Sequence, residues 1–479
     1  MKWAVVMMTS ATILAGTVAA QQSSQSQKNR PNIVIIITDD QGYADISFNP
    51  HHPPEVSTPH MDTLAREGVF FNQAYISGCV CSPTRAGLML GRYQQRVGVY
   101  TAGEGGRGFD PKIPIFPSFL PKEYKSTAIG KWHLGLDEDY PELKWHALSR
   151  GFDECYKFMG RGAHDYYNLK GASGIDDTGP MYRNKKRIDD EGYLTTRFTE
   201  EACDFIGRSR KQPFFLYLAY NAVHFPKQAP RADIDRFKKK FPNLTEDRAI
   251  LMAMLYHLDL GVGSVVKKLK DEGVWDNTLL LFFTDNGGAK VMEANNAPLR
   301  GFKHSFYEGG IRTPFIVTWP AQIKPNRKID TPIISLDILP TVLDALDVTP
   351  PPTAARFDGR SLLPLLRGDS SAPVHKNLFF SSGGAEGKWA VRSGDWKLVA
   401  DRDKRELYNL AADPAEQNNL ATPELVAKFE KLYDAWLDQM ADPLSGSPKK
   451  WKPGVLSSSE KKRLRDQQRK AKAKSRNQK

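Results

Sequence analysis

The feature that most constrains the fold is an unbroken run of β-branched apolar residues at positions 32–38, which ends in Asp39-Asp40. A strand with one face in water alternates apolar and polar residues, so an unbroken run is typical of a strand buried on both faces of a sheet. Similar runs occur at 214–218, at 278–283 and, more weakly, at 315–317. The chain is therefore expected to build a sheet that other elements cover on both sides.

Helical patterns separate or follow these runs. They lie at residues 59–67, 83–91, 246–270, 333–346 and 423–440. Strands that alternate with helices predict an α/β fold with a central, mostly parallel sheet and helices on both faces. Strand-like pieces between residues 378 and 409, separated by glycine and aspartate turns, predict a small antiparallel sheet near the C-terminus.

The first 20 residues have the pattern of a cleaved signal peptide. Lys2 precedes an apolar run, and small residues at 18–20 precede Gln21. A membrane anchor is the alternative, but the run is shorter than the roughly 20 residues that a spanning helix needs. No later apolar run is expected to span a bilayer. We therefore expect an exported protein, periplasmic or secreted, without a membrane span.

Polar side chains follow three of the apolar runs closely: Asp39-Asp40, residues 221–224 and Asp285-Asn286. In parallel sheets ligands collect at the carboxyl ends of strands, so these groups are expected at one edge. Three carboxylates and one amide form an all-oxygen set, which favours calcium or magnesium over zinc or copper. A strand-end cap or turn is the alternative for either pair alone.

Cys81 opens the stretch 81–92, whose Pro83 suits the first turn of a helix. Cys81 would then lie at a helix N-terminus, where backbone amides favour an anion. A reactive thiolate and a buried structural cysteine both fit this spacing. Four cysteines are too few for a disulfide framework in 479 residues. Cys155 and Cys203 are interpreted as structural, and Cys79 as a small buried residue or a partner for another cysteine.

The stretch from Cys81 resembles the signature of the formylglycine-dependent sulfatases, arylsulfatase-like members of the alkaline phosphatase superfamily, in which the cysteine of a Cys-x-Pro-x-Arg core becomes formylglycine. The resemblance runs from residue 32 to about residue 420. The further motifs that match are, in order along the chain, Asp39-Asp40-Gln41-Gly42, Gly130-Lys131-Trp132-His133-Leu134-Gly135, Thr284-Asp285-Asn286-Gly287, and the stretch 299–315 with Lys303.

This resemblance implies a metal site and a cofactor. One Ca²⁺, with Mg²⁺ as the alternative, would be bound by Asp39, Asp40, Asp285, Asn286 and the formylglycine made from Cys81. A formylglycine-generating enzyme or an anaerobic sulfatase-maturating enzyme would carry out that conversion.

The resemblance also implies roles for the other residues. A hydroxyl of the hydrated formylglycine would attack sulfur while Asp285 takes its proton, and the second hydroxyl would expel sulfate with His133 as the base. Lys131 and Lys303 would hold the sulfate oxygens, His224 would protonate the leaving oxygen, and Arg85 would orient the formylglycine.

Signals for substrate contacts are weaker. His164 lies in a glycine-rich segment, 160–167, that is similar to a family segment at the pocket entrance, and its side chain looks exposed in the sequence. His304 and the expected loop 104–110, with Arg107, are weaker candidates.

These observations predict a sulfuric ester hydrolase that acts on sulfated saccharides or polysaccharides. The alternatives are a phosphodiester or phosphonate ester hydrolase of the same superfamily and a non-catalytic polyanion-binding protein. No nucleic-acid partner is expected. We expect a signal peptide at 1–20, a linker at 21–30, a catalytic domain at 31–372, a small sheet-and-helix subdomain at 373–445 and a basic tail at 446–479.

The tail contributes much of the formal net charge of +12. Its last 20 residues hold ten lysines and arginines against two acidic residues. Such a composition predicts a disordered or frayed helical segment. Attraction to a polyanion and a solvated tail without a partner both remain open.

Overall fold

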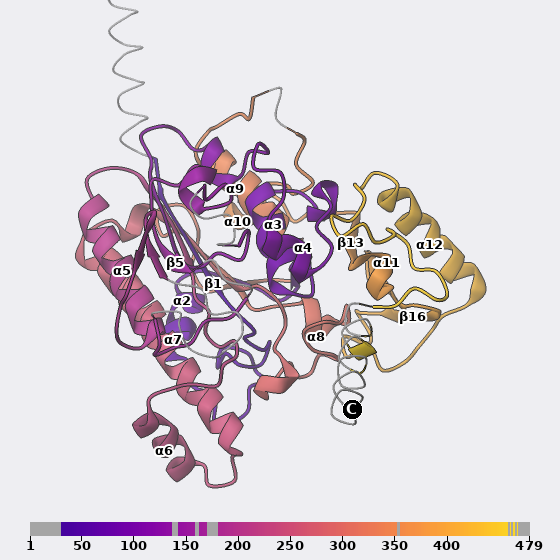
Figure 1. Cartoon of the computed structure of the whole chain (residues 1–479), viewed down its shortest axis with the longest axis horizontal. Coiled ribbons are helices and arrows are strands. Elements are labelled where there is room, and N and C mark those ends of the chain that lie inside the picture. Colours follow the sequence, from indigo (N-terminus) through magenta and orange to yellow (C-terminus); the bar gives the residue numbers. More distant parts are fainter. Residues whose placement is uncertain are drawn as a thin grey trace, which may run out of the picture.

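The computed structural model describes residues 30–136, 142–158, 162–169, 181–351 and 355–457, together with residues 460, 463, 464 and 467. The expected signal peptide, the linker before residue 30 and most of the basic tail lie outside the described residues. Figure 1 shows a large body built on one twisted sheet and a smaller C-terminal part beside it.

The main sheet contains ten strands among the described residues. Its four central strands are parallel, and each is a direct neighbour of the next. Antiparallel pairs occur toward both edges, which makes the sheet mixed with a parallel centre. The strands, in spatial order, are β11 (Arg327–Ile329), β2 (Val69–Phe71), β10 (Phe315–Thr318), β9 (Thr278–Thr284), β1 (Asn32–Thr38), β8 (Phe214–Ala219), β4 (Lys125–Lys131), β5 (Glu154–Phe158), β6 (Met181–Arg183) and β7 (Lys186–Ile188).

Helices cover both faces of this sheet, as expected (Figure 1). Residues Ile33, Ile35 and Ile37 of β1 enter one apolar core, and Val34 and Ile36 enter the other. One core takes in α3 (Cys81–Leu90), α9 (Ile338–Ala345) and α10 (Leu363–Arg367). The other takes in α2 (Pro59–Arg66), α5 (Leu194–Ser209), α6 (Arg231–Lys240) and α7 (Glu246–Asp271). The unbroken apolar pattern of β1 follows from this burial on both sides.

The expected helix at 333–346 is only partly correct. Its first residues form β12 (Ile333–Ile334), which pairs in parallel with β3 (Ala74–Tyr75). A short 3₁₀ turn follows, and α9 begins at Ile338. Asp337 accounts for the break, because its carboxylate accepts hydrogen bonds from the backbone N–H groups of Ile334, at 2.9 Å, and Arg360, at 2.8 Å.

Helix α7 is long enough and apolar enough to span a membrane, contrary to the expectation that no later run would do so. Within its most apolar 18 residues, 61% are buried inside the protein. The helix packs against α5, α6 and α2 over the sheet. Its apolar residues therefore belong to the core in this structure.

The small antiparallel sheet near the C-terminus is confirmed. Its strands, in order, are β13 (Asn377–Ser381), β14 (Lys388–Ser393), β15 (Trp396–Asp401) and β16 (Lys404–Asn409). The short helix α11 (Gly383–Glu386) and the longer α12 (Pro423–Leu437) accompany it. Leu398 of β15 and Phe429 of α12 join the same apolar core as α3, so this part packs directly on the main body.

A buried charged cluster also joins the two parts. Lys397 of β15 lies 2.8 Å from Glu308 of α8 (Glu308–Ile311) and 2.9 Å from Glu416, and all three side chains are fully buried. The Tyr75 hydroxyl donates a hydrogen bond to Glu308 at 2.7 Å. Because buried charges are costly unless they are paired, this cluster fixes how the small sheet sits against the body.

Candidate active site

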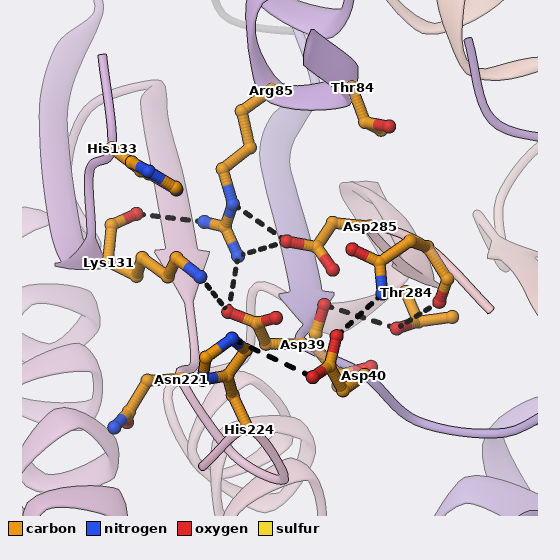
Figure 2. A network of polar contacts seen from close by, with 12 residues as sticks. Asp39, Asp40, Thr84, Arg85, Lys131, His133, Asn221, His224, Thr284 and Asp285 are labelled. Carbon is orange, nitrogen blue, oxygen red and sulfur yellow. Dashed lines mark hydrogen bonds and ion pairs between the residues drawn. The ribbon is translucent and has the colours of Figure 1, made fainter. Parts of the chain in front are cut away.

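The candidate residues converge because four parallel strands end at the same level. Thr38 pairs with Thr284, and Ala219 pairs with both Ile37 and Gly130. Asp39, Asp285 and Lys131 therefore lie close together in Figure 2, at the ends of β1, β9 and β4. The expectation that polar groups following the strands gather at one edge of the sheet agrees with this geometry.

Strand β4, which ends in Lys131, is not apparent in the hydropathy pattern. Gly130 is required there by its backbone, which has φ of +100°. A Cβ at this position would also lie 1.9 Å from the Ala219 carbonyl oxygen of β8. Glycine therefore allows β4 to approach β8 closely and carry Lys131 to the site.

Cys81 is the first residue of α3 and is 4% exposed. Val80 precedes the helix in an extended conformation, and its side chain provides no cap for the first-turn amides. The Ser82 hydroxyl donates a hydrogen bond to the His133 carbonyl oxygen at 2.7 Å, which ties the helix start to the segment after β4. Cys81 thus lies at the anion-favouring end of a helix.

Arg85, one turn into α3, is fully buried and connects the helix to three strand ends (Figure 2). Its Nε donates to Asp285 Oδ2 at 2.9 Å, and its Nη1 donates to the Lys131 carbonyl oxygen at 2.8 Å. Its Nη2 lies 3.5 Å from Asp39 Oδ2. Arg85 therefore fixes the position of Cys81 relative to the acidic cluster.

Asp39, Asp40, Asp285 and Asn286 form the predicted oxygen set. One buried oxygen on each of Asp39, Asp285 and Asn286, the Oδ1 atom in every case, has no hydrogen-bond partner among the described residues. Buried polar atoms are normally paired, so three unpaired oxygens in one cluster fit the ligands of a hard cation. Asp39, Asp40 and His224 also offer ligand atoms within 4.8 Å of one another, and His224 was not among the predicted ligands.

Cations surround these carboxylates. Lys131 pairs with Asp39, and Lys303 Nζ lies 2.7 Å from Asp40 Oδ1. Burial raises the pKa of Asp39, but Lys131, His224, Arg85 and Lys303 outweigh it and hold that pKa below its usual range. Burial, and then the neighbouring Asp39, raise the pKa of Asp285 well above its usual value despite Arg85. The two carboxylates therefore differ in proton affinity.

His224 lies at the edge of this cluster and is partly exposed. Its Nδ1 is 2.7 Å from the Phe225 carbonyl oxygen, and its Nε2 is 3.7 Å from Asp40 Oδ2. Burial, and then Lys303, lower the pKa of His224 to about 4, although Asp40 opposes them. The ring is thus held by one nitrogen while the other faces the acidic and basic groups of the site.

His133 is buried, in a left-handed backbone conformation with φ of +53°. Burial, followed by Lys131 and Arg85, lowers its pKa well below the usual value, so the imidazole is neutral. Two glycines make room for it: a Cβ on Gly106 would lie 3.2 Å from its Nε2, and one on Gly162 would lie 2.9 Å from its Cε1. Both glycines lie in segments considered for substrate contacts, 104–110 and 160–167, but only the fold shows that they make room for His133.

The structure corrects the expectation that His164 is exposed. Its side chain is fully buried, its Nδ1 lies 2.7 Å from the Asp165 carbonyl oxygen, and its ring packs on Phe158. The Asp165 carboxylate accepts a hydrogen bond from Gln228 at 3.0 Å, which links this segment to the one that follows His224. His164 is therefore a buried packing residue in this structure, and Tyr167, which is exposed, is the more accessible neighbour.

The expected loop at 104–110 is also incorrect in part. Residues 102–107 form the short helix α4 (Ala102–Arg107), and the buried Glu104, its third residue, completes a capping box with the N-cap residue Thr101. Glu104 accepts hydrogen bonds from the backbone of Tyr100 and Thr101, at 2.8 and 2.9 Å. The Thr101-x-x-Glu104 spacing of a capping box was a signal for this helix.

His304 lines a cavity of about 500 Å³ together with Cys79 and Lys388. The backbone N–H of His304 donates a hydrogen bond to the Cys79 carbonyl oxygen at 2.9 Å. Cys79 and the other three cysteines are all free, so Cys79 is a buried residue without a disulfide partner.

Asn221, which follows β8, was noted only as part of a polar cluster, yet its buried side-chain amide has no hydrogen-bond partner among the described residues.

Comparison with known proteins agrees with this geometry. Residues 31–348 match the sulfatase family model, and residues 302–442 match the model for the C-terminal region of N-sulphoglucosamine sulphohydrolase. The chain belongs to the sulfatase family. It is a sulfuric ester hydrolase with the sulfatase fold of the alkaline phosphatase superfamily, as the motifs around Cys81 predict.

The alignments with named relatives extend over most of this sulfatase. An uncharacterised sulfatase of Escherichia coli is 29% identical, over 88% of this chain and 88% of its own. The N-acetylgalactosamine-6-O-sulfatase of Bacteroides thetaiotaomicron is 29% identical, over 87% of this chain and 94% of its own. The crystal structure of Ps i-CgsB in complex with k-i-k-neocarrahexaose superposes with a TM-score of 0.79 at 31% identity, covering 87% of this chain and 94% of that one.

Proposed function

We propose that this sulfatase releases inorganic sulfate from sulfated carbohydrates, using a formylglycine made from Cys81 and one Ca²⁺ bound by Asp39, Asp40, Asp285 and Asn286. The observation that carries the proposal is the cluster of three unpaired buried oxygens, one of them on Asp285, whose carboxylate interacts electrostatically with Cys81 at the start of α3. Hard oxygen ligands suit Ca²⁺, with Mg²⁺ as the alternative.

The chain's own residues supply the remaining functions. When present, the hydrated formylglycine supplies the nucleophile, and Ca²⁺ neutralises charge on the sulfate oxygens. Lys131 and Lys303 provide further positive charge for those oxygens. Asp285 accepts a proton from the nucleophile at position 81, Arg85 holds that residue in place, and His133 serves as a buried neutral base.

His224 donates a proton to the leaving oxygen in this proposal. Its Nδ1 is engaged with the Phe225 carbonyl oxygen, so its Nε2 is the atom that would carry the transferred proton. A negatively charged ester bound beside His224 would raise the pKa of the imidazole. The proton would then be available when the ester is in place.

Carbohydrate esters are proposed because relatives are named for them. One relative is an N-acetylgalactosamine-6-O-sulfatase, and one similar structure holds k-i-k-neocarrahexaose. We further propose that the chain is exported to a periplasm or out of the cell, on the basis of residues 1–20. Its Cys81 would be converted by a formylglycine-generating or an anaerobic sulfatase-maturating enzyme.

The test compares the hydrolysis of three classes of ester at the candidate active site. Enzyme produced together with a maturating enzyme is assayed on a 4-nitrophenyl sulfate, phosphodiester and phosphonate ester, with Cys81→Ala as the blank. We expect the highest kcat/KM on the sulfate, and sulfate release from at least one sulfated saccharide. A higher kcat/KM on the phosphodiester or phosphonate would favour the alternative hydrolase, and no turnover of any ester would favour polyanion binding alone.

The metal is tested separately by elemental analysis. We expect about one calcium per chain in the wild type and a loss of bound metal in Asp39→Asn/Asp40→Asn. Bound zinc, or calcium retained by the double variant, would contradict the proposed ligand set.

A further inference from the structure

A second polar cavity lies at the far end of the helix that begins with Cys81. It has a volume of about 740 Å³, and its lining includes Arg92, Arg96, Arg356, Arg360 and Gln439. Helix α3 ends at Leu90, two residues before Arg92. At about 1.5 Å of rise per residue, the cavity lies roughly 15 Å along the helix from Cys81. It is therefore separate from the candidate active site.

The one acidic residue in the lining is already engaged. Asp358 accepts hydrogen bonds from Arg96 Nε and Nη2, both at 2.7 Å. The backbone N–H of Tyr93 donates a further bond to Asp358 at 2.9 Å. This bidentate pair neutralises Arg96, so Asp358 has little capacity left for the other guanidinium groups.

The other three arginines of the lining are not neutralised. In the described parts of the chain, the side chains of Arg92, Arg356 and Arg360 form no ion pair or hydrogen bond. Arg356 and Arg360 are exposed, and Arg92 is half-buried. Burial, and then the neighbouring Arg96, lower the pKa of Arg92, although Asp358 opposes them. Positive charge in a concave site attracts and concentrates anions.

We propose that this arginine cavity, formed by Arg92, Arg96, Arg356 and Arg360, is a second binding site for sulfate or carboxylate groups carried on an anionic saccharide. Guanidinium groups match the oxygens of such groups through paired N–H donors. The volume is in the range of pockets that hold small organic ligands and is far larger than one sulfate ion needs. Phe357 and Gln439 add an apolar surface and an amide to the lining for the body of a sugar. The proposal does not depend on the ester chemistry at Cys81.

The test uses the double variant Arg356→Gln/Arg360→Gln in the full chain. Both residues are exposed, and neither belongs to the candidate active site. The matched control is Lys211→Gln/Lys239→Gln, which removes two exposed positive charges elsewhere on the surface. Binding of dextran sulfate oligomers and, separately, of inorganic sulfate is measured by calorimetry at low salt. The kcat/KM for 4-nitrophenyl sulfate reports whether the fold and the active site are intact.

We expect the arginine variant to bind dextran sulfate at least about tenfold more weakly than wild type, because two charge-assisted contacts are lost. The lysine control should bind as wild type does, and all three proteins should hydrolyse 4-nitrophenyl sulfate equally. A parallel loss of one inorganic sulfate site would show that free sulfate also occupies the cavity. Unchanged dextran sulfate binding in the arginine variant, or an equal loss in the lysine control, would overturn the proposal.

Discussion

Local sequence was enough to select the candidate site residues, because each belongs to a short motif with a chemical reason for its residue types. Cys81, Arg85, Lys131, Asp285 and Lys303 come together around one charged cluster, and their catalytic roles stay predictions. Exposure was harder to predict. His164 looked exposed beside glycines and tyrosines, but its burial depends on packing against Phe158, a contact that residue order alone does not reveal.

At this scale His224 can be tested as the group that protonates the leaving oxygen. His224→Ala should lower kcat on a sulfated saccharide by roughly 10²- to 10⁴-fold, because an alcohol leaves poorly without a proton. Hydrolysis of 4-nitrophenyl sulfate should fall much less, since nitrophenolate leaves without protonation. The exposed His51→Ala serves as the control and should change neither rate. Equal losses on the two substrates would assign His224 to binding or structure.

At the scale of elements, continuous apolar runs predicted β1, β8 and β9 within one residue at each end. Strand β4 escaped this reasoning because Lys125-Ser126-Thr127 gives it a polar start, and its burial comes from neighbouring β8 and β5. The helix expected at 333–346 was too long, again because pairing with a distant strand decides the local structure. Ile333 and Ile334 suit either a helix or a strand, and pairing with β3 decides between them.

The buried charged cluster between the small sheet and the body gives a stability prediction. Lys397→Met removes the cation shared by Glu308 and Glu416 and leaves Glu308 only the longer ion pair with Arg312, at 3.5 Å, so we expect a loss of about 3–5 kcal/mol in the free energy of unfolding. Lys404→Met on β16 removes a lysine that is 60% exposed and pairs with Glu406, and should cost less than about 1 kcal/mol. Urea unfolding at neutral pH compares the two. Similar losses in both variants would show that the buried cluster is not the stronger link.

At the scale of the whole molecule, alternating strands and helices predicted the layers but not their order. The neighbours of β1 are β8 and β9, which lie about 180 and 245 residues further along the chain. Such pairings depend on long-range packing and are not encoded in any single segment. The strands β6, β7 and β11, at or near the edges of the sheet, have three residues each and are also too short to show a pattern.

Acid sensitivity of the whole fold should depend in part on His146. Burial, and then Lys157, lower the pKa of this histidine from 6.5 to about 3 in the folded protein. The unfolded chain therefore binds its proton at higher pH, and the stability present above pH 6.5 is lost as the pH falls toward 3. Between pH 7.5 and 4.5 this contribution amounts to about 2–3 kcal/mol.

The check is to compare wild type with His146→Gln, whose amide oxygen can still accept the Leu148 N–H that His146 Nδ1 accepts at 3.3 Å. Urea unfolding at pH 7.5 and at pH 4.5 should show a smaller acid-induced loss in the variant. The same loss in both proteins would mean that other groups govern acid unfolding.

The central claim, sulfate ester hydrolysis by a converted Cys81, is tested most directly by tandem mass spectrometry of the peptide that contains residue 81, taken from preparations of different specific activity. The account predicts a product in which the sulfur and two hydrogens of the cysteine are replaced by one oxygen, in a fraction that rises in proportion to sulfatase activity. Full activity in a preparation whose peptide carries only unmodified cysteine at position 81 would contradict the account.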